Sequence, residues 1–426
     1  MELYGKILNI AMPIFLLLVI LEKIYGKLKG NDTVPVMDAI SSLSSGMTNV
    51  VKDVLGLSVA IISYEWIVQH IAIFTIQNTI AVYIIAFIAL DFYGYWVHRL
   101  SHQINIFWNK HAIHHSSEEF NLACALRQSI SSFVNLFTFF LIPAAILGVP
   151  GSVIAIVAPI QLFAQFWYHT QHINKMGFLE KIIVTPSHHR VHHAINPEYL
   201  DKNHSQIFII WDKIFGTFQE ELPNVKPVYG ITRPAQTFNP IKINFQHLWL
   251  LTKDAWRTKN LKDKFIIWFK PTGWRPADVA EKFPVNKIDD VYNFEKYIVP
   301  NSSLVSIWSG IQLIINLFFI SFFFAHIAQI GSPNMFFYGA FVLISIYSIT
   351  ELMDFNPKAF IWEGVRLIMG IFLISQQGDW FGINSYFEYG SYIILFYLIL
   401  SFITVSYLSR FEVKKQLETN LKHTIK

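Results

Sequence analysis

Histidines are concentrated in one stretch of this chain. Twelve of its sixteen histidines lie between residues 98 and 204. They recur at spacings of three and four residues, which place side chains on one face of a helix. Imidazoles gathered in this way are above all metal ligands. The stretch therefore predicts metal chemistry, and the rest of the chain is expected to position it.

Three short motifs carry the strongest candidates. HRLSH (98–102) places two rings one helical turn apart, while HAIHH (111–115) and HRVHH (189–193) each place three rings on one helical face. Eight histidines are more than the four that close a structural zinc site. We therefore predict two metal ions with open coordination positions, which suits iron. The predicted ligands are His98, His102, His111, His114, His115, His189, His192 and His193.

Further polar residues lie near these motifs. His169, His172 and His188 are candidates for additional ligands. Asp91, Gln103, Glu118, Asp201 and His204 are candidates for hydrogen-bond partners that fix the orientation of ligand rings. The isolated histidines at 70, 247, 326 and 423 are expected to be ordinary polar residues.

Composition indicates an all-α polytopic membrane protein. Hydrophobic residues make up 53% of the 426-residue chain and charged residues 15%, with a mean hydropathy of +0.39. The net charge of +4 is modest and its cations lie in loops, so nucleic-acid binding is not indicated. A single cysteine permits no intrachain disulfide and no thiolate metal site.

Nine windows are long and apolar enough to predict membrane spans. An even number of crossings separates the histidine groups, so both groups lie on the same face of the membrane. The distribution of Lys and Arg predicts that this face is cytoplasmic. The basic tail 410–426 is predicted to lie on the same side. Glu363 and Arg366 fall inside one window and are either functional or a buried ion pair. The windows are 7–24, 54–70, 71–97, 130–147, 151–168, 303–324, 335–352, 358–376 and 391–409.

Four regions follow from this pattern. We predict N-terminal spans over 1–90, a catalytic region over 91–250, a cytoplasmic aromatic-rich segment over 251–300, and a C-terminal bundle with its tail over 301–426. The aromatics between the last histidine motif and residue 300 fit a packed cytoplasmic cap better than a surface for lipid entry. Both interpretations remain open.

Two other classes of metal protein compete with an oxygenase. A zinc metalloprotease needs HExxH, and HRLSH lacks the glutamate that serves as its general base. A metal transporter or sensor places ligands near the middle of the bilayer, whereas most of these histidines lie at span ends. Transport remains the alternative outside the enzyme class.

The order of the three motifs resembles the fatty acid hydroxylase and sterol desaturase superfamily of integral membrane di-iron oxygenases. Longer segments resemble its branch that acts on alkylglycerols. These segments include HHSSEEFNLACALRQS (114–129), QFWYHTQHI (165–173), TPSHHRVHH (185–193) and DKNHSQIFIIWDKIFGTF (201–218).

The resemblance implies a reaction and its cofactors. It implies that the eight motif histidines hold two iron ions, and that O2 and tetrahydrobiopterin, a soluble electron donor, serve to hydroxylate a lipid. The implied substrate is an alkylglycerol, whose hydroxylated ether carbon breaks down to an aldehyde. Another lipid, such as a fatty acid, sterol or carotenoid, is the alternative substrate for hydroxylation or desaturation. Two residues depart from the family pattern. Gln103, which follows the predicted ligand His102, stands where the family has an acidic residue. His172 stands where the family has an apolar residue.

Overall fold

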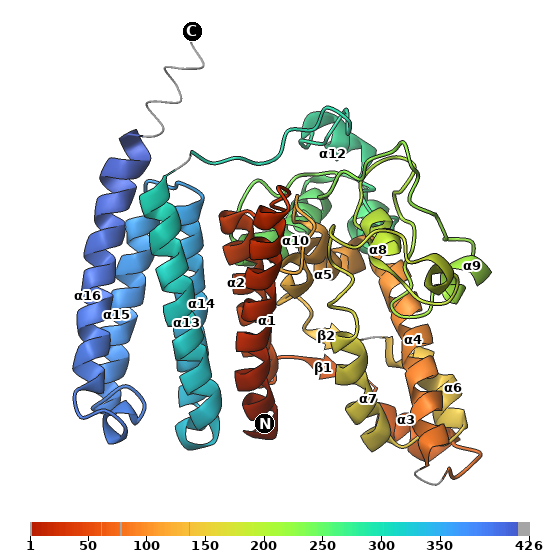
Figure 1. Ribbon diagram of the computed structural model, residues 1–426, viewed down its shortest axis with the longest axis horizontal. Helices are drawn as coiled ribbons and strands as arrows, with labels where there is room; N and C mark the ends of the chain where they lie inside the picture. Colours follow the sequence, from red (N-terminus) through yellow and green to blue (C-terminus); the bar gives the residue numbers. More distant parts are fainter. Residues whose placement is uncertain (1, 61, 77–78, 136, 301, 416–426) are drawn as a thin grey trace.

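The computed structural model describes residues 2–60, 62–76, 79–135, 137–300 and 302–415 (Figure 1). Helices are the main regular structure of the described chain. Its one small sheet is a parallel pair of two-residue strands, β1 (Val59–Ala60) and β2 (Val134–Asn135). Residues 416–426 of the predicted basic tail, including His423, lie outside the described part.

The helices of the first half of the chain include those that carry the histidine motifs. They are α1 (Glu2–Leu28), α2 (Val36–Val54), α3 (Tyr64–Ile71), α4 (Ile80–Gln103), α5 (Asn105–His115), α6 (Ile142–Ile146), α7 (Gly151–Phe163), α8 (Pro186–His192) and α9 (Ile210–Ile214). Short 3-10 turns join them: η1 (Cys124–Leu126), η2 (Phe137–Leu141) and η3 (Gly177–Lys181).

The second half contains a peripheral segment and then a bundle. The peripheral elements are α10 (Pro240–Arg257), α11 (Leu261–Ile266), η4 (Ile267–Phe269) and α12 (Ala277–Lys282). The bundle is formed by α13 (Ser303–Ile330), α14 (Asn334–Met353), α15 (Ala359–Gln377) and α16 (Gly390–Tyr407), with the turns η5 (Ile383–Ser385) and η6 (Leu408–Glu412).

Six helices of the described chain are long and apolar enough to cross a bilayer. A helix rises about 1.5 Å per residue, so roughly 20 residues cover the hydrocarbon layer. The chain is therefore a multi-pass membrane protein. The spans are Ile7–Leu28, Ile80–Gln103, Ser303–Ile330, Asn334–Met353, Ala359–Gln377 and Gly390–Lys415.

The prediction of nine spans is not confirmed. The windows 54–70, 130–147 and 151–168 contain no described helix of spanning length. In the first window α2 ends at Val54, Gly56 has a positive φ of 66°, and Ser63 caps the short α3. In the second window Pro143 lies in the first turn of α6, directly after the 3-10 turn η2, and in the third window α7 ends at Phe163. A hydropathy window measures apolar composition and does not show where a helix begins and ends.

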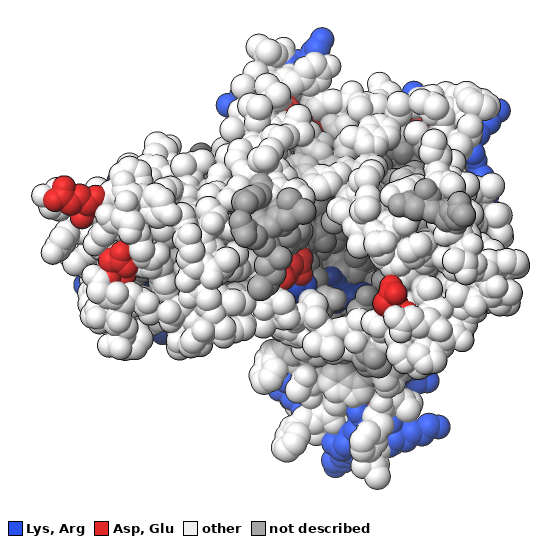
Figure 2. All heavy atoms as spheres, turned by 90° about the horizontal axis from the view of Figure 1, so that it is seen from below, with Lys and Arg blue, Asp and Glu red and all other residues white. Residues whose placement is uncertain are grey.

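The interrupted segments still bring the histidines to one end of the molecule. Figure 1 shows the short helices α3 and α6 near one end of α4, and α5 and α8 at its other end. His98 and His102 lie in the last turns of α4, at the same end as α5 and α8. Seen from the opposite end, the molecule is hollowed in its middle, and acidic and basic side chains are visible inside the hollow (Figure 2).

The bundle α13–α16 shares one core with α1 and α2. Phe319 and Phe323 of α13, Phe341 of α14 and Trp380 are almost fully buried there. Within the same bundle, Arg366 pairs with Glu363 at 2.9 Å, and both are at most 2% exposed. The geometry fits the buried ion pair, one of the two interpretations of these residues.

Candidate metal centre

A break between α4 and α5 sets up the first part of the site. Ile104 is extended, with φ −124° and ψ 128°, and separates the two helices. The Asn105 side chain donates hydrogen bonds to the carbonyl oxygens of Ile267 and Trp274, at 3.0 and 3.1 Å, which anchors the start of α5. The chain turns here, and His111 of α5 comes to face His98 of α4, with 2.9 Å between their Nε2 atoms.

Five rings converge in a first group, which we call the five-histidine cluster. One ring nitrogen of each member lies within 4.8 Å of the others. The Nε2 atom of His115 is 3.2 Å from that of His102 and 3.0 Å from that of His111. The cluster consists of His98, His102, His111, His115 and His192.

Four rings converge in a second group, the four-histidine cluster. The Nε2 atom of His189 lies 2.8 Å from that of His169, and the Nε2 atom of His193 lies 3.0 Å from that of His189. His114 completes the group, with its Nε2 atom 3.1 Å from that of His193.

The two motifs with i, i+3, i+4 spacing, HAIHH and HRVHH, each contribute histidines to both clusters. Helix α5 contributes His111 and His115 to one cluster and His114 to the other. The α8 motif contributes His192 to the first and His189 and His193 to the second. The clusters are adjacent, since the rings of His115 and His193 stack with centroids 4.3 Å apart.

Most of the rings form a hydrogen bond through Nδ1, the ring nitrogen that points away from the cluster. Where Nδ1–H donates a hydrogen bond to a fixed acceptor, the Nε2 lone pair is free to face the cluster. Four rings bond to backbone carbonyls and one to a carboxylate. The pairs are His98 with His204 O (2.7 Å), His114 with Arg127 O (3.3 Å), His169 with Gln165 O (3.0 Å), His192 with Lys202 O (2.9 Å) and His102 with Asp201 Oδ1 (3.2 Å).

Burial keeps the cluster rings outside the spans neutral. It lowers the pKa of His114 to about 4, and it lowers the pKa values of His111, His115, His189 and His193 well below the ordinary value. Neutral rings carry a lone pair for a metal at physiological pH. Facing lone pairs about 3 Å apart repel each other unless a cation lies between them, so both donor sets fit metal ions.

Comparison with known proteins agrees with this geometry. The fatty acid hydroxylase family model matches residues 83–217, which include every clustered histidine. Alkylglycerol monooxygenase from Homo sapiens is 37% identical over 369 residues, covering 85% of this chain and 81% of the relative. The enzyme of that name from Xenopus tropicalis is 33% identical, covering 85% and 81%.

This chain belongs to the alkylglycerol monooxygenase family. A more distant relative, the ornithine lipid hydroxylase of Rhizobium tropici, is 27% identical over 149 residues, covering 35% of this chain and 45% of the relative. No solved structure matches the chain. The resemblance inferred from the three motifs is thus confirmed, and the family's matched segment is the one that carries both clusters.

All eight histidines predicted from the motifs lie in the two clusters, and His169 joins them. His172 and His188 lie outside both. The His172 ring is 3.2 Å from Thr33 Oγ1 through Nε2 and packs edge-on against Tyr25, while His188 packs against Phe218.

The other predicted partners fall into two groups. Asp201 and His204 contact cluster rings, as given above. Asp91 instead accepts hydrogen bonds from the backbone of Ile207 and Phe208, so it orders the 201–215 loop. Glu118 accepts from the backbone of Tyr297, and Gln103 has an exposed side chain at the end of α4.

Two buried arginines beside the four-histidine cluster were not predicted. The carbonyl of Arg127 accepts from His114, and its guanidinium donates to Asp38 of α2 at 2.6 Å and to Ser116 at 2.7 Å. Asp38 lies 89 positions from Arg127 and before the segment that the family model matches. No local pattern links such distant residues, so only the fold shows the contact.

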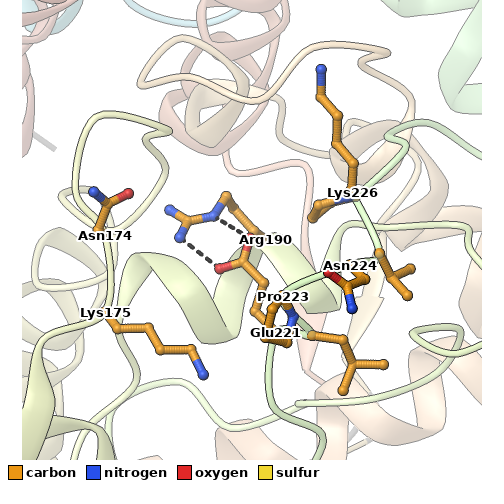
Figure 3. Close-up of a pocket in the computed structure, with 10 residues that line it drawn as sticks. Asn174, Lys175, Arg190, Glu221, Pro223, Asn224 and Lys226 are labelled. Atoms are coloured by element: carbon orange, nitrogen blue, oxygen red, sulfur yellow. Dashed lines mark hydrogen bonds and ion pairs between the residues drawn. The ribbon is translucent and has the colours of Figure 1, made fainter.

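Arg190, the second of these arginines, lies within α8 itself. It pairs with Glu221 through two nitrogens, at 2.9 and 2.7 Å (Figure 3). It also donates to the carbonyls of Thr170 and Ile173. These bonds join α8 to the segment that follows His169. The ion pair lines an open surface cavity of about 620 Å³, whose rim includes Lys175 and Lys226.

Proposed function

We propose that the protein is a di-iron membrane monooxygenase that hydroxylates alkylglycerols. The observation that carries the proposal is the convergence of nine histidine rings in two adjacent clusters, in a chain 37% identical to a human alkylglycerol monooxygenase. The five-histidine cluster would hold one iron ion and the four-histidine cluster the other. Five ligands exceed the four of a structural zinc site, which favours iron.

The reaction proposed is oxygen insertion into a C–H bond of the ether-bearing carbon. Bound iron would supply the reductive activation of O2, with electrons from a soluble donor, for which the resemblance suggests tetrahydrobiopterin. The hydroxylated carbon is a hemiacetal, which breaks down to a fatty aldehyde and a glycerol derivative. The chain's own residues hold the rings, fix their orientation and exclude bulk water from the clusters.

The position of the clusters suits a lipid substrate. They lie at the end of α4, so they are near the depth of the lipid headgroups, where the ether bond of an alkylglycerol also lies. Lysines beside the spans favour a cytoplasmic location for this end, accessible to soluble donors.

The purified full-length protein provides the test. We expect iron to be bound and alkylglycerol to be consumed with formation of aldehyde, dependent on O2 and on added tetrahydrobiopterin. If the protein binds iron but hydroxylates a different lipid, the proposed substrate would be wrong and the proposed class of reaction would stand. Zinc with no consumption of O2 would contradict the proposal and favour transport or metal sensing.

Arg127→Lys should selectively weaken metal binding at the four-histidine cluster. Lysine keeps the charge but cannot donate to Asp38, Ser42 and Ser116 from one planar group. Loss of such a support typically lowers metal affinity 10–100-fold. Titration of the metal-stripped protein with Co²⁺ should show one of two binding phases weakened by about that factor.

Arg275→Lys is the matched control for this substitution. Arg275 forms a comparably buried, two-nitrogen pair with Asp254, away from both clusters. We expect both Co²⁺ phases to be retained in this variant. Equal weakening of both phases by Arg127→Lys would show a general loss of structure and contradict a selective role.

A further inference from the structure

The segment from Trp249 to Lys270 exposes large hydrophobic side chains, and we call it the aromatic collar. It comprises the end of α10, then α11 and η4. Five of its side chains are mostly exposed. They are Trp249 (62%), Trp256 (85%), Leu261 (68%), Phe265 (69%) and Phe269 (70%). A concentration of this kind on a protein surface indicates an interaction site.

The collar is a folded amphipathic element with two distinct faces. Ile243, Leu250 and Leu251 of α10 are buried, so the helix already packs one face on the protein. Trp249 and Trp256 are seven residues apart and lie on the opposite face. The exposed aromatics are therefore an outer face that the described fold leaves uncovered.

Contacts with two membrane spans set the depth of this face. The Asn239 side chain, at the start of α10, donates to Glu351 in the last turn of α14 at 3.1 Å. Ile104, which ends α4, forms a β-bridge with Pro271, and the Asn105 amide donates to the carbonyl of Lys270 at 3.0 Å. The collar is thus tied to the ends of α4 and α14. Span ends lie at the boundary between hydrocarbon and water.

The charge of the collar suits lipid headgroups. Residues 249–270 contain six basic residues and two acidic ones. One of the acidic residues, Asp254, is fully buried and paired with Arg275, so it does not offset the surface charge. Interfacial helices combine Trp and Phe on the apolar side with Lys and Arg on the polar side. Anionic lipids attract such basic segments.

We propose that the aromatic collar lies in the headgroup layer of the bilayer, on the histidine side, and contacts anionic lipids there. The sequence favoured a packed cap over a surface for lipid entry. The exposures, depth and charge of the collar favour contact with lipid instead of a packed cap. The inference does not depend on the metal or on the reaction.

The collar would also fix the depth of the metal clusters. Its helix α10 packs on α5, which carries three cluster histidines, and the Leu248 amide donates to the Asn109 side chain at 2.8 Å. Asn105 adds its bonds to η4 and to Lys270. A collar held in the headgroup layer would therefore also hold the His111–His115 segment at a fixed depth relative to the bilayer.

The native cysteine makes a clean labelling experiment feasible. Cys124 is fully buried, so it does not compete with an introduced surface thiol for a fluorescent label. Trp256→Cys and Phe265→Cys place labels on the collar in the full-length protein, and Asn224→Cys places one at the exposed rim of the surface cavity. Each labelled protein is reconstituted into vesicles containing phosphatidylserine and exposed to aqueous iodide or to brominated lipid.

We expect the two collar labels to be quenched by brominated lipid and to lose quenching by iodide, with the reverse result at residue 224. Replacing phosphatidylserine with a neutral lipid should increase quenching by iodide at the collar. Collar labels quenched by iodide as strongly as the control would overturn the proposal. Labels shielded from both quenchers would also overturn it, because a protein partner or second copy would then cover the collar.

Discussion

His114→Ala is expected to reduce bound metal from two ions per chain to about one and to abolish turnover. The ring belongs to the four-histidine cluster, and its removal leaves three donors in a buried site. The five-histidine cluster shares no ligand with it and should keep its ion. Chemistry that needs both ions would then be lost although the protein remains folded. Metal analysis and the alkylglycerol assay on one preparation measure both effects.

His326→Ala is the matched control, because His326 lies on α13 outside both clusters and contacts Gln329 and Tyr386. We expect it to retain two ions and normal turnover. A His114→Ala protein with full activity would refute the assignment of this residue. Loss of both ions would show that the two sites are not independent.

Arg366→Leu is expected to lower the free energy of unfolding by about 3–5 kcal/mol, the usual cost of leaving one partner of a buried pair alone. Arg366 donates to Glu363 and to Gln312, at 2.9 and 3.0 Å, and to the Tyr397 hydroxyl. These partners come from three helices of the bundle. Without the guanidinium, the buried Glu363 carboxyl group would lose its ion-pair partner. Denaturation in mixed micelles gives the change in free energy.

The double variant Glu363→Leu, Arg366→Leu should recover part of this loss, because it removes both charges from the apolar interior. Arg410→Leu serves as the control. Arg410 is exposed and contacts the Phe360 ring at 4.5 Å, so its loss should change stability by only about 0.5 kcal/mol. An Arg366→Leu protein as stable as the wild type would show that the network does not hold the bundle together.

The histidine motifs could be found from the sequence because their spacing is local. A helix places i, i+3 and i+4 side chains on one side, so the eight motif histidines were predictable as candidates. How they divide was not predictable. His114 and His115 are adjacent in sequence yet join different clusters, because α4 supplies His98 and His102 to one cluster and the segment after α7 supplies His169 to the other.

The membrane topology was only partly predictable for a related reason. Long uninterrupted apolar runs such as 303–324 do form spans, whereas the helices in the windows 54–70, 130–147 and 151–168 are too short to do so. Gly56 has a positive φ in the first of these windows, and Pro143 lies in the first turn of α6 in the second. The Ser-rich helix α2 gives no hydropathy signal, and its buried Asp38 contacts Arg127 from far away in the chain. Contacts of this kind depend on tertiary packing and leave no local pattern.

The most direct test of the central claim is to measure metal identity and content together with reaction stoichiometry in the purified full-length protein. The proposed function predicts two iron ions per chain, and one aldehyde formed for each O2 consumed in the presence of alkylglycerol and the electron donor. A protein that holds zinc, or that binds two iron ions but consumes neither O2 nor any lipid, would contradict it.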